Sequence, residues 1–147
     1  MDPVDLTLRR AALDEILPLR HAVLRPGLAR ATAQFDGDHD PATRHFAALS
    51  GATVVGCVSA MRRALDGVDA WQVRGMATRD DLAGRGIGRA LLASATEALR
   101  AEPGPRLLWC NARVTALRFW ERAGWEAVSD VFDIPGVGPH RVLRRSL

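Results

Sequence analysis

The sequence predicts an α/β fold in which a mixed β-sheet of about six to seven strands is flanked by helices. Segments with apolar residues at every second position alternate with segments in which apolar residues recur at helical spacing. Residues 44–78 also predict three successive strands with no helix between them, whereas a doubly wound nucleotide-binding fold alternates strands and helices throughout.

The N-terminal half predicts one strand, one helix and three further strands. Residues 4–11 alternate apolar and polar side chains, and residues 13–26 carry apolar side chains at helical spacing. The polar residues 28–43 predict a mobile connection with a short helix. The three further strands are expected at 44–50, 52–64 and 70–78, the first two as a hairpin about Gly51.

The C-terminal half predicts two strand–helix units and a terminal hairpin. A helix over about 86–101 is followed by a strand at 106–112 and a short helix at 114–124. A strand at 125–134, a turn at 135–139 and a final strand at 140–147 complete the chain.

The composition predicts a single domain over residues 1–147. Of these 147 residues, 48% are hydrophobic, which is enough to form a core. No apolar run reaches the roughly 18 residues that a membrane-spanning helix needs, and the acidic N-terminus does not resemble a signal peptide. Two cysteines, Cys57 and Cys110, do not form a disulfide framework. We therefore expect a cytoplasmic protein without a membrane partner.

All the basic charge behind the net charge of +3 comes from arginine, because the chain contains no lysine. The arginines are spread along the chain rather than gathered in one arm or helix, so we expect no nucleic-acid partner. Without lysine, neither Schiff-base chemistry nor a P-loop lysine is available.

The segment DDLAGRGIGRALL, residues 80–92, places three glycines directly before an apolar helix. Gly84, Gly86 and Gly88 let backbone N–H groups approach a ligand, and the helix N-terminus adds partial positive charge. The segment lacks the Lys-Ser/Thr pair of a P-loop, and its third glycine is out of register for a dinucleotide fingerprint. These residues therefore predict a phosphate-binding loop of another kind.

Two segments resemble the GCN5-related N-acetyltransferases (GNAT family). In that family a loop of pattern Q/R-x-x-G-x-G/A opens a helix with a Leu-Leu pair; Gly86 and Gly88 match the glycines, and Ala83 replaces the leading Gln or Arg. The segment NARVTALRFWERAGW, residues 111–125, resembles the family's second block. Its matching residues are Asn111, Ala116, Phe119, Gly124 and Trp125. The resemblance covers roughly residues 5–147 and implies the family's acyl-CoA N-acyltransferase fold.

The resemblance implies an enzyme that transfers the acetyl group of acetyl-CoA to a primary amine of a small molecule, by direct attack in a ternary complex. Pantetheine would lie between the strands near 72–78 and 107–112, and a backbone N–H near Met76 or Ala77 would donate to the oxyanion. The implied cofactor-binding residues are Met76, Ala77, Thr78, Ala83, Gly84, Arg85, Gly86, Ile87, Gly88, Arg89, Asn111, Ala116, Phe119 and Trp120.

The proton-transfer groups stay open. Many family members use a tyrosine of the second block as general acid, but this chain has Trp120 there and no tyrosine anywhere. An indole has no useful acidity, which leaves Cys110, Ser129 or water. The candidates for the general base are water, His21, His45 and His140. His140 is preferred because the terminal hairpin borders the substrate cleft in the family.

The expected acceptor contacts are Arg74, Asp36 and His45. Arg74 is either solvated or a ligand for a substrate carboxylate or a catalytic water. The acidic FDGDHD segment, residues 35–40, is either a solvated loop or attracts a cationic amine, and it departs from the calcium-loop pattern, so no metal is expected. Three further arginines are either solvated or ligands for the 3′-phosphate of coenzyme A: Arg113, Arg118 and Arg122.

Other functions remain as alternatives. The acceptor could be a protein N-terminus or lysine, or the chain could be a CoA-binding sensor or structural protein without catalysis, which the missing tyrosine favours. A nucleotide oxidoreductase is a third alternative, which binding of NADH would support. The sequence does not determine the oligomeric state; dimers are common in the family, which suggests a homodimer only by analogy.

Overall fold

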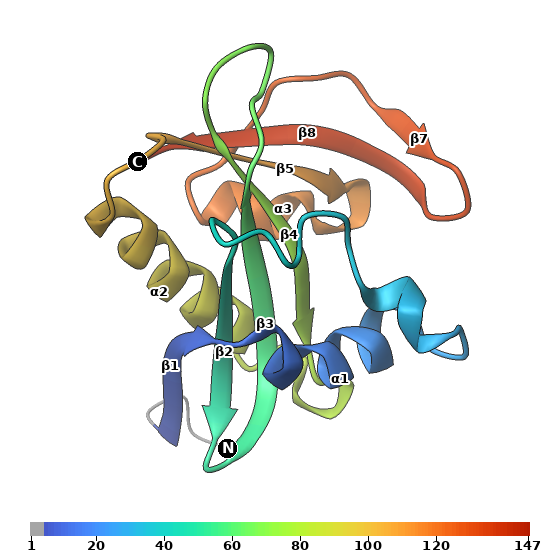
Figure 1. The fold of residues 1–147 in the computed structure, drawn as a ribbon. Coiled ribbons are helices and arrows are strands. Elements are labelled where there is room, and N and C mark those ends of the chain that lie inside the picture. The colour runs from blue at the N-terminus through green and yellow to red at the C-terminus, as the bar shows by residue number, and fades with distance from the viewer. Residues whose placement is uncertain (1–4) are drawn as a thin grey trace.

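One mixed sheet of eight strands forms the centre of the fold, in a computed structural model that describes residues 5–147. The strands are β1 (Leu6–Ala11), β2 (Arg44–Ser50), β3 (Thr53–Arg62), β4 (Trp71–Thr78), β5 (Leu107–Arg113), β6 (Glu126–Ala127), β7 (Phe132–Ile134) and β8 (Gly138–Ser146). Their order in the sheet is β1-β2-β3-β4-β5-β8-β6, with β7 also paired to β8 (Figure 1). Every pair is antiparallel except β4 with β5.

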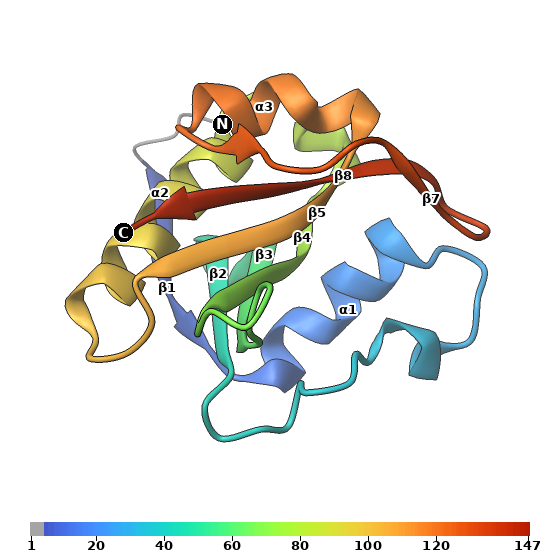
Figure 2. The same cartoon turned by 90° about the horizontal axis from the view of Figure 1, so that it is seen from above.

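Two helices cover opposite faces of the β1–β4 part of the sheet, as the view from above shows (Figure 2). The α-helices are α1 (Leu13–Leu24), α2 (Ile87–Ala101) and α3 (Leu117–Arg122), and the 3-10 helices are η2 (Arg30–Ala33), η3 (Asp80–Leu82) and η4 (Val114–Ala116). Because successive strand residues point to opposite faces, Phe46 and Ala48 join the core under α2, while Ala47 and Leu49 join the core under α1.

The long helix α2 owes its position to one apolar stripe. Its buried residues are Ile87, Leu91, Leu92, Ala95, Thr96 and Leu99. This spacing gives a single helical face that packs on the sheet. A Cβ at Gly56 of β3 would lie 3.2 Å from the Ile87 side chain, so the glycine lets the start of α2 approach the sheet closely.

The predicted fold class is confirmed, and most predicted elements lie within a few residues of their expected positions. The predicted strand at 4–11 begins at Leu6, and Val4 lies outside the described residues. The predicted single strand at 125–134 is wrong, because β6 and β7 are separated there. Between their pairings Ala127↔Leu143 and Phe132↔His140, four residues of this segment face two of β8, so the chain bulges away from the ladder.

Among residues 5–147, no helix has both the length and the apolar character needed to cross a membrane.

Candidate active site

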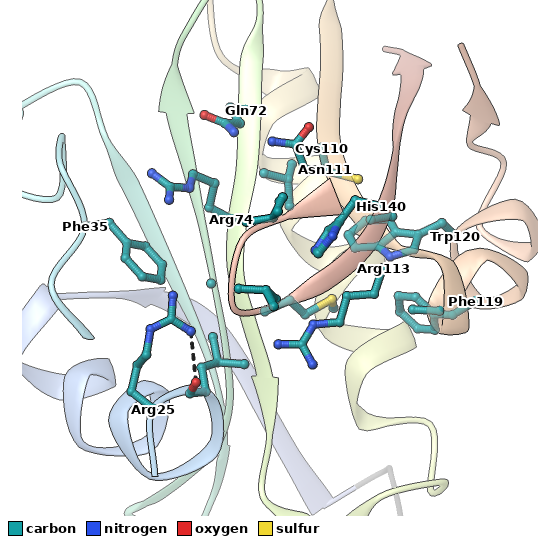
Figure 3. A pocket seen from close by; sticks show the side chains of 18 residues that line it. Arg25, Phe35, Gln72, Arg74, Cys110, Asn111, Arg113, Phe119, Trp120 and His140 are labelled. Atoms are coloured by element: carbon teal, nitrogen blue, oxygen red, sulfur yellow. Dashed lines mark hydrogen bonds between the residues drawn. The ribbon is translucent and has the colours of Figure 1, made fainter. Parts of the chain in front are cut away.

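A gap between two parallel strands forms the first part of the site. β4 and β5 pair only at Trp71↔Leu108 and Gln72↔Trp109, and the strands diverge beyond these residues. A cavity of about 420 Å³ lies in this gap, lined by residues 72–76 of β4 and 110–113 of β5 (Figure 3). Side chains from α1, the 28–43 connection, α3 and the β7–β8 turn complete its walls. We call this space the splay cavity.

A β-bulge distorts β4 where it borders the splay cavity. The register runs from Ser59↔Arg74 to Cys57↔Ala77, so Gly75 and Met76 together face the single residue Val58. Gly75 has a φ of +65°, which a residue with a side chain rarely adopts. A bulge leaves backbone groups outside the ladder and is frequent beside active sites. Met76 lines the cavity at this point, whereas Ala77 is paired with β3 and buried under α1.

The glycine-rich loop forms the second part of the site. Gly84 and Gly86 have φ values of +77° and +80°, and nothing lies within 4 Å of where their Cβ atoms would stand. Gly86 is the N-cap of the 15-residue helix α2, whose first N–H groups have no partner within the helix. A cavity of about 540 Å³, the loop cavity, borders this loop. Its lining is Thr78, Leu82, Ala83, Gly84, Gly86, Ile87, Gly88, Arg89, Phe119, Arg122 and Ala123.

The two cavities are neighbours, because Phe119 of α3 lines both. Of the expected cofactor-binding residues, seven besides Phe119 line the loop cavity: Thr78, Ala83, Gly84, Gly86, Ile87, Gly88 and Arg89. Met76, Asn111, Ala116 and Trp120 line the splay cavity. Arg85 and Ala77 line neither cavity.

His140 is the histidine that the fold brings to the splay cavity. It is buried on β8 opposite Arg113, and its Nδ1 lies 2.7 Å from the Gly138 carbonyl oxygen. A carbonyl oxygen can only accept, so in the neutral ring Nδ1 carries the proton and Nε2 keeps its lone pair. Neither His21, whose Nε2 bonds the Leu28 carbonyl oxygen, nor His45 lines this cavity.

The candidate acids differ in their positions. Cys110 lines the splay cavity, and burial raises the pKa of its thiol to about 12. Ser129 does not line it; its hydroxyl accepts from the Val142 N–H at 2.8 Å and donates to the Asp130 carbonyl oxygen. Trp120 packs edge-on against Phe119 and Trp125, with ring centroids 5.4 Å and 4.8 Å away. Trp120 therefore shapes the wall and offers no acidic proton.

Arginines and one phenylalanine form the wall of the splay cavity opposite His140 (Figure 3). Arg74 and Arg25 stack on Phe35, with their guanidinium carbons 4.5 Å and 5.9 Å from the ring centroid. Burial, together with nearby arginines, lowers the pKa of Arg74, although an arginine remains protonated under all ordinary conditions. Arg113 also lines the cavity. Phe35 and Arg25 were not singled out in the sequence, where nothing distinguishes them from surface residues.

A buried polar network holds the 28–43 connection in place. Asp38 accepts hydrogen bonds from Arg20 at 2.7 Å and from the Phe35 N–H at 2.6 Å. Arg20 also donates to the Ser59 hydroxyl at 2.8 Å, and both charged side chains are fully buried. His45 bonds Ser59 at 2.6 Å through Nδ1 and the Asp38 carbonyl oxygen at 3.0 Å through Nε2.

These contacts give His45 a structural position rather than one at the cavity. Its Nε2–H donates to the Asp38 carbonyl oxygen, and its Nδ1 accepts the Ser59 hydroxyl proton, which requires a neutral ring. Burial lowers the pKa of His45, which agrees with a neutral ring. Asp36 also lies outside the cavity lining, with an exposed side chain 3.8 Å from Arg63. Among residues 5–147, no three metal-ligating side chains converge.

Comparison with known proteins gives a consistent picture. Residues 11–125 match the model of the acetyltransferase (GNAT) family. The uncharacterised N-acetyltransferase YitI of Bacillus subtilis (strain 168) is 28% identical over 145 residues, which are 97% of each chain. The crystal structure of Escherichia coli ElaA has a TM-score of 0.78 at 17% identity, covering 96% of this chain and 99% of that one.

A second solved structure contains the relevant ligand. An aminoglycoside 6′-N-acetyltransferase complexed with coenzyme A has a TM-score of 0.73 at 12% identity. The match covers 95% of this chain and 96% of that one. At these identities the solved structures establish the shared fold, and the family match covers most of this chain.

Proposed function

Since the chain belongs to the acetyltransferase (GNAT) family, we propose that it transfers the acetyl group of acetyl-CoA to a primary amine of a small molecule. The observation that carries this proposal is the adjacency of the loop cavity and the splay cavity, which share Phe119. One cavity suits a pyrophosphate, and the other opens between two strands that could admit a pantetheine arm. The coenzyme A in the solved aminoglycoside acetyltransferase of the same fold supports this assignment.

The loop cavity fits a pyrophosphate on three grounds. The N-terminus of α2 presents unpaired N–H groups and partial positive charge. Gly84 and Gly86 leave the approach to these groups open. Arg89 and Arg122 line the cavity, and no carboxylate of residues 5–147 does. Together these three features favour an anionic ligand over a neutral or cationic one.

Two groups of the chain would act on the reacting atoms. Bound acetyl-CoA supplies a thioester whose carbonyl carbon accepts the amine nitrogen. The Met76 N–H is the preferred oxyanion donor, because Met76 sits in the bulge and has no paired residue on β3, whereas Ala77 does. His140 would take the amine proton on Nε2 as the new N–C bond forms.

The departing sulfur would receive its proton from water. Cys110 lines the splay cavity, but burial raises the pKa of its thiol to about 12, which makes it a poor proton donor. Trp120 cannot donate a proton usefully, and Ser129 lies outside the cavity lining. Water can reach the sulfur through an opening to solvent, so protonation of the leaving thiolate requires no acidic side chain.

The melting temperature with and without acetyl-CoA, coenzyme A or NADH tests the binding half of the proposal. Ligand at about a hundred times its dissociation constant stabilises the folded state by about 2.7 kcal/mol, which shifts the melting temperature by several degrees. We expect a shift with acetyl-CoA and coenzyme A and none with NADH. A shift with NADH alone would favour the oxidoreductase alternative.

A matched pair of variants on α2 locates the binding. Gly88→Glu places a carboxylate at the loop cavity without backbone strain, because Gly88 does not have a positive φ. The neighbours of a Cβ there lie at ordinary distances of 3.5 Å or more. Ala93→Glu adds the same charge on the exposed face of the same helix. We expect the acetyl-CoA shift to vanish in Gly88→Glu and to persist in Ala93→Glu. Loss in both, or in neither, would contradict the assignment.

Release of free thiol from acetyl-CoA in the presence of amines tests the catalytic half. We expect His140→Gln to lower kcat about 10² to 10⁴-fold, the usual contribution of a general base, while the acetyl-CoA melting shift remains. His39→Gln, on an exposed residue of the 28–43 connection, serves as the matched control. Binding of acetyl-CoA without turnover of any amine or peptide would instead favour the sensor alternative, and turnover of peptides alone a protein acetyltransferase.

A further inference from the structure

Among the residues that the structure describes, three arginines and no carboxylate line the splay cavity. Arg25 comes from the end of α1, Arg74 from β4 and Arg113 from the end of β5, so separate elements bring positive charge to one space. The acidic segment at 35–40 does not offset this charge at the cavity. Its exposed member Asp36 lies outside the lining, and Asp38 is buried in its pair with Arg20.

The charge of Arg74 lies at the cavity without a carboxylate partner among the described residues. Its side chain is half-buried, and among residues 5–147 its guanidinium makes no hydrogen bond and no ion pair with another side chain. By contrast, the buried Arg20 is paired with Asp38 at 2.7 Å, and Arg44 is paired with Glu102 at 2.8 Å. Among residues 5–147, Arg25 and Arg113 have no carboxylate partner either, and Arg25 bonds the Leu24 carbonyl oxygen. Withdrawing an unpaired charge from water is unfavourable. A bound anion would remove this cost.

Phe35 fixes the orientation of the Arg74 guanidinium. The ring lies 4.5 Å from the Arg74 guanidinium carbon and 4.2 Å from that of Arg20. The backbone N–H of Phe35 is held by the buried Asp38 carboxylate at 2.6 Å, so the ring cannot drift with its loop. A guanidinium stacked on an aromatic ring keeps its edge free, and this edge matches the two oxygens of a carboxylate.

We propose that the acceptor is an amine that also carries a carboxylate, as in an amino acid, and that Arg74 binds this carboxylate. The assignment rests on the proposed acetyl transfer. Arg25, Phe35 and Arg74 lie on one side of the cavity and His140 lies on the other, so the acceptor's anionic end and its reacting amine would be held on opposite walls (Figure 3). Arg25 and Arg113 add positive potential that attracts the anion.

The same charges disfavour a polycationic acceptor. The reacting nitrogen must be neutral, but every further ammonium group of a polyamine would enter a cavity that already holds three guanidinium groups. Like charges in a partly dehydrated space repel strongly. The residues that complete the acceptor wall are apolar, namely Leu24, Ile134 and Val137, and they provide no counter-charge.

Matched pairs of acceptors test the proposal in the wild-type enzyme. Thiol release is measured with the twenty standard L-amino acids and with the corresponding α-amides, which lack the carboxylate charge but keep the amine. For the best acceptors we expect kcat/KM for the acid to exceed that for the amide at least tenfold. The aminophosphonate analogue of the best acid is the third arm. A phosphonate that outperforms the carboxylate would overturn the assignment to a carboxylate.

The variant Arg74→Gln removes the charge and keeps a polar side chain. We expect it to lower kcat/KM for the acid about ten- to a hundredfold, mostly through KM, and to leave the amide nearly unchanged. Arg106→Gln, on an exposed arginine whose contact is the Arg100 carbonyl oxygen, should change neither value. The melting shift with acetyl-CoA should be the same in all three proteins.

The outcomes separate the two levels of the argument. Amides or polyamines that react as well as the acids, with Arg74→Gln at full activity, would overturn the carboxylate assignment while leaving acetyl transfer intact. Turnover of none of the amines, with or without acetyl-CoA binding, would overturn acetyl transfer and the acceptor assignment with it.

Discussion

Replacing Gly75 with alanine should destabilise the protein through two separate effects. The backbone at Gly75 has a φ of +65°, in the left-handed region that disfavours a side chain. An added Cβ would also lie 2.9 Å from Nε of Arg20 and 3.0 Å from a ring carbon of Phe35. Arg20 cannot move aside easily, because it is fully buried and its guanidinium is bonded to Asp38, Ser59 and the Ala33 carbonyl oxygen.

The two effects have different magnitudes. Placing a residue with a Cβ in the left-handed region costs roughly 1–2 kcal/mol. Forcing an extra methyl group into a packed interior costs roughly another 1–3 kcal/mol. We therefore expect Gly75→Ala to lower the free energy of unfolding by about 2–5 kcal/mol, a large share of the 5–15 kcal/mol or so that is usual for a folded domain.

Gly51→Ala isolates the backbone effect. Gly51 has a φ of +60° in the β2–β3 turn, and nothing lies within 4 Å of its Cβ position. Equilibrium unfolding in urea should give a loss of about 1–2 kcal/mol for this variant. Alanine lowers the conformational entropy of the unfolded chain, which stabilises the folded state by the same amount in both variants, so this contribution cancels in the comparison. A loss in Gly75→Ala no greater than that in Gly51→Ala would refute the packing argument.

Three further predictions concern buried titratable groups. Asp38→Asn should lower the free energy of unfolding in urea by about 3–5 kcal/mol, because it leaves the fully buried Arg20 charge uncompensated. Burial lowers the pKa of His45 in the folded protein. As the pH falls below about 6.5, the usual pKa of histidine, the unfolded chain therefore binds a proton that the folded chain does not. The stability should therefore fall from pH 7 toward pH 5, by up to about 1.4 kcal/mol per pH unit, and His45→Gln should flatten this slope. Burial raises the pKa of Cys57 to about 11 and that of Cys110 to about 12, so iodoacetamide at pH 8 should modify both thiols at least about a hundredfold more slowly in the folded protein than in urea.

Each of these three has a control or a contrary result. Glu102→Gln breaks a partly exposed pair with Arg44 and should cost within about 1 kcal/mol; an equal cost for Asp38→Asn would contradict the buried-charge argument. If the free energy of unfolding depends on pH in His45→Gln as it does in the wild type, groups other than His45 cause that dependence. Rapid alkylation of Cys110 in the folded protein would mean that the splay cavity exposes a thiolate.

The glycine loop that we propose for the cofactor could be predicted because it depends on the backbone. A phosphate loop needs glycines at fixed spacing before a helix, so Gly84 and Gly86 stand out in the sequence, and the structure gives both a positive φ. The strand that leads to this loop is also predictable, because residues 70–78 form a short strand-like run after the turn at 65–69. The bulge at Gly75 was not predicted, because it depends on how β4 pairs with β3 rather than on local residue types.

The wall that we propose for the acceptor could not be predicted because it consists of side chains from distant segments. Arg25 ends α1, Phe35 lies in the polar connection and Arg74 lies on β4, and only the tertiary fold stacks them. The family resemblance suggests Asp36 as an acceptor contact, because its loop often walls the acceptor site in the family, and His45 is a further candidate. The structure instead gives His45 to the buried network and leaves Asp36 exposed outside the cavity lining, since neither position is fixed by local periodicity.

The two halves of the site rest on different parts of the core. The buried Arg20 side chain packs against both the Gly75 bulge and the Phe35 ring, so it supports the strand beside the proposed oxyanion donor and the acceptor wall together. The glycine loop instead rests on α2 and the opposite face of the sheet. Substitutions that break the Arg20–Asp38 pair should therefore weaken acceptor binding and turnover more than they weaken acetyl-CoA binding. Under the proposed function, substitutions on the α1 side of the sheet would alter the choice of acceptor without changing the proposed phosphate loop.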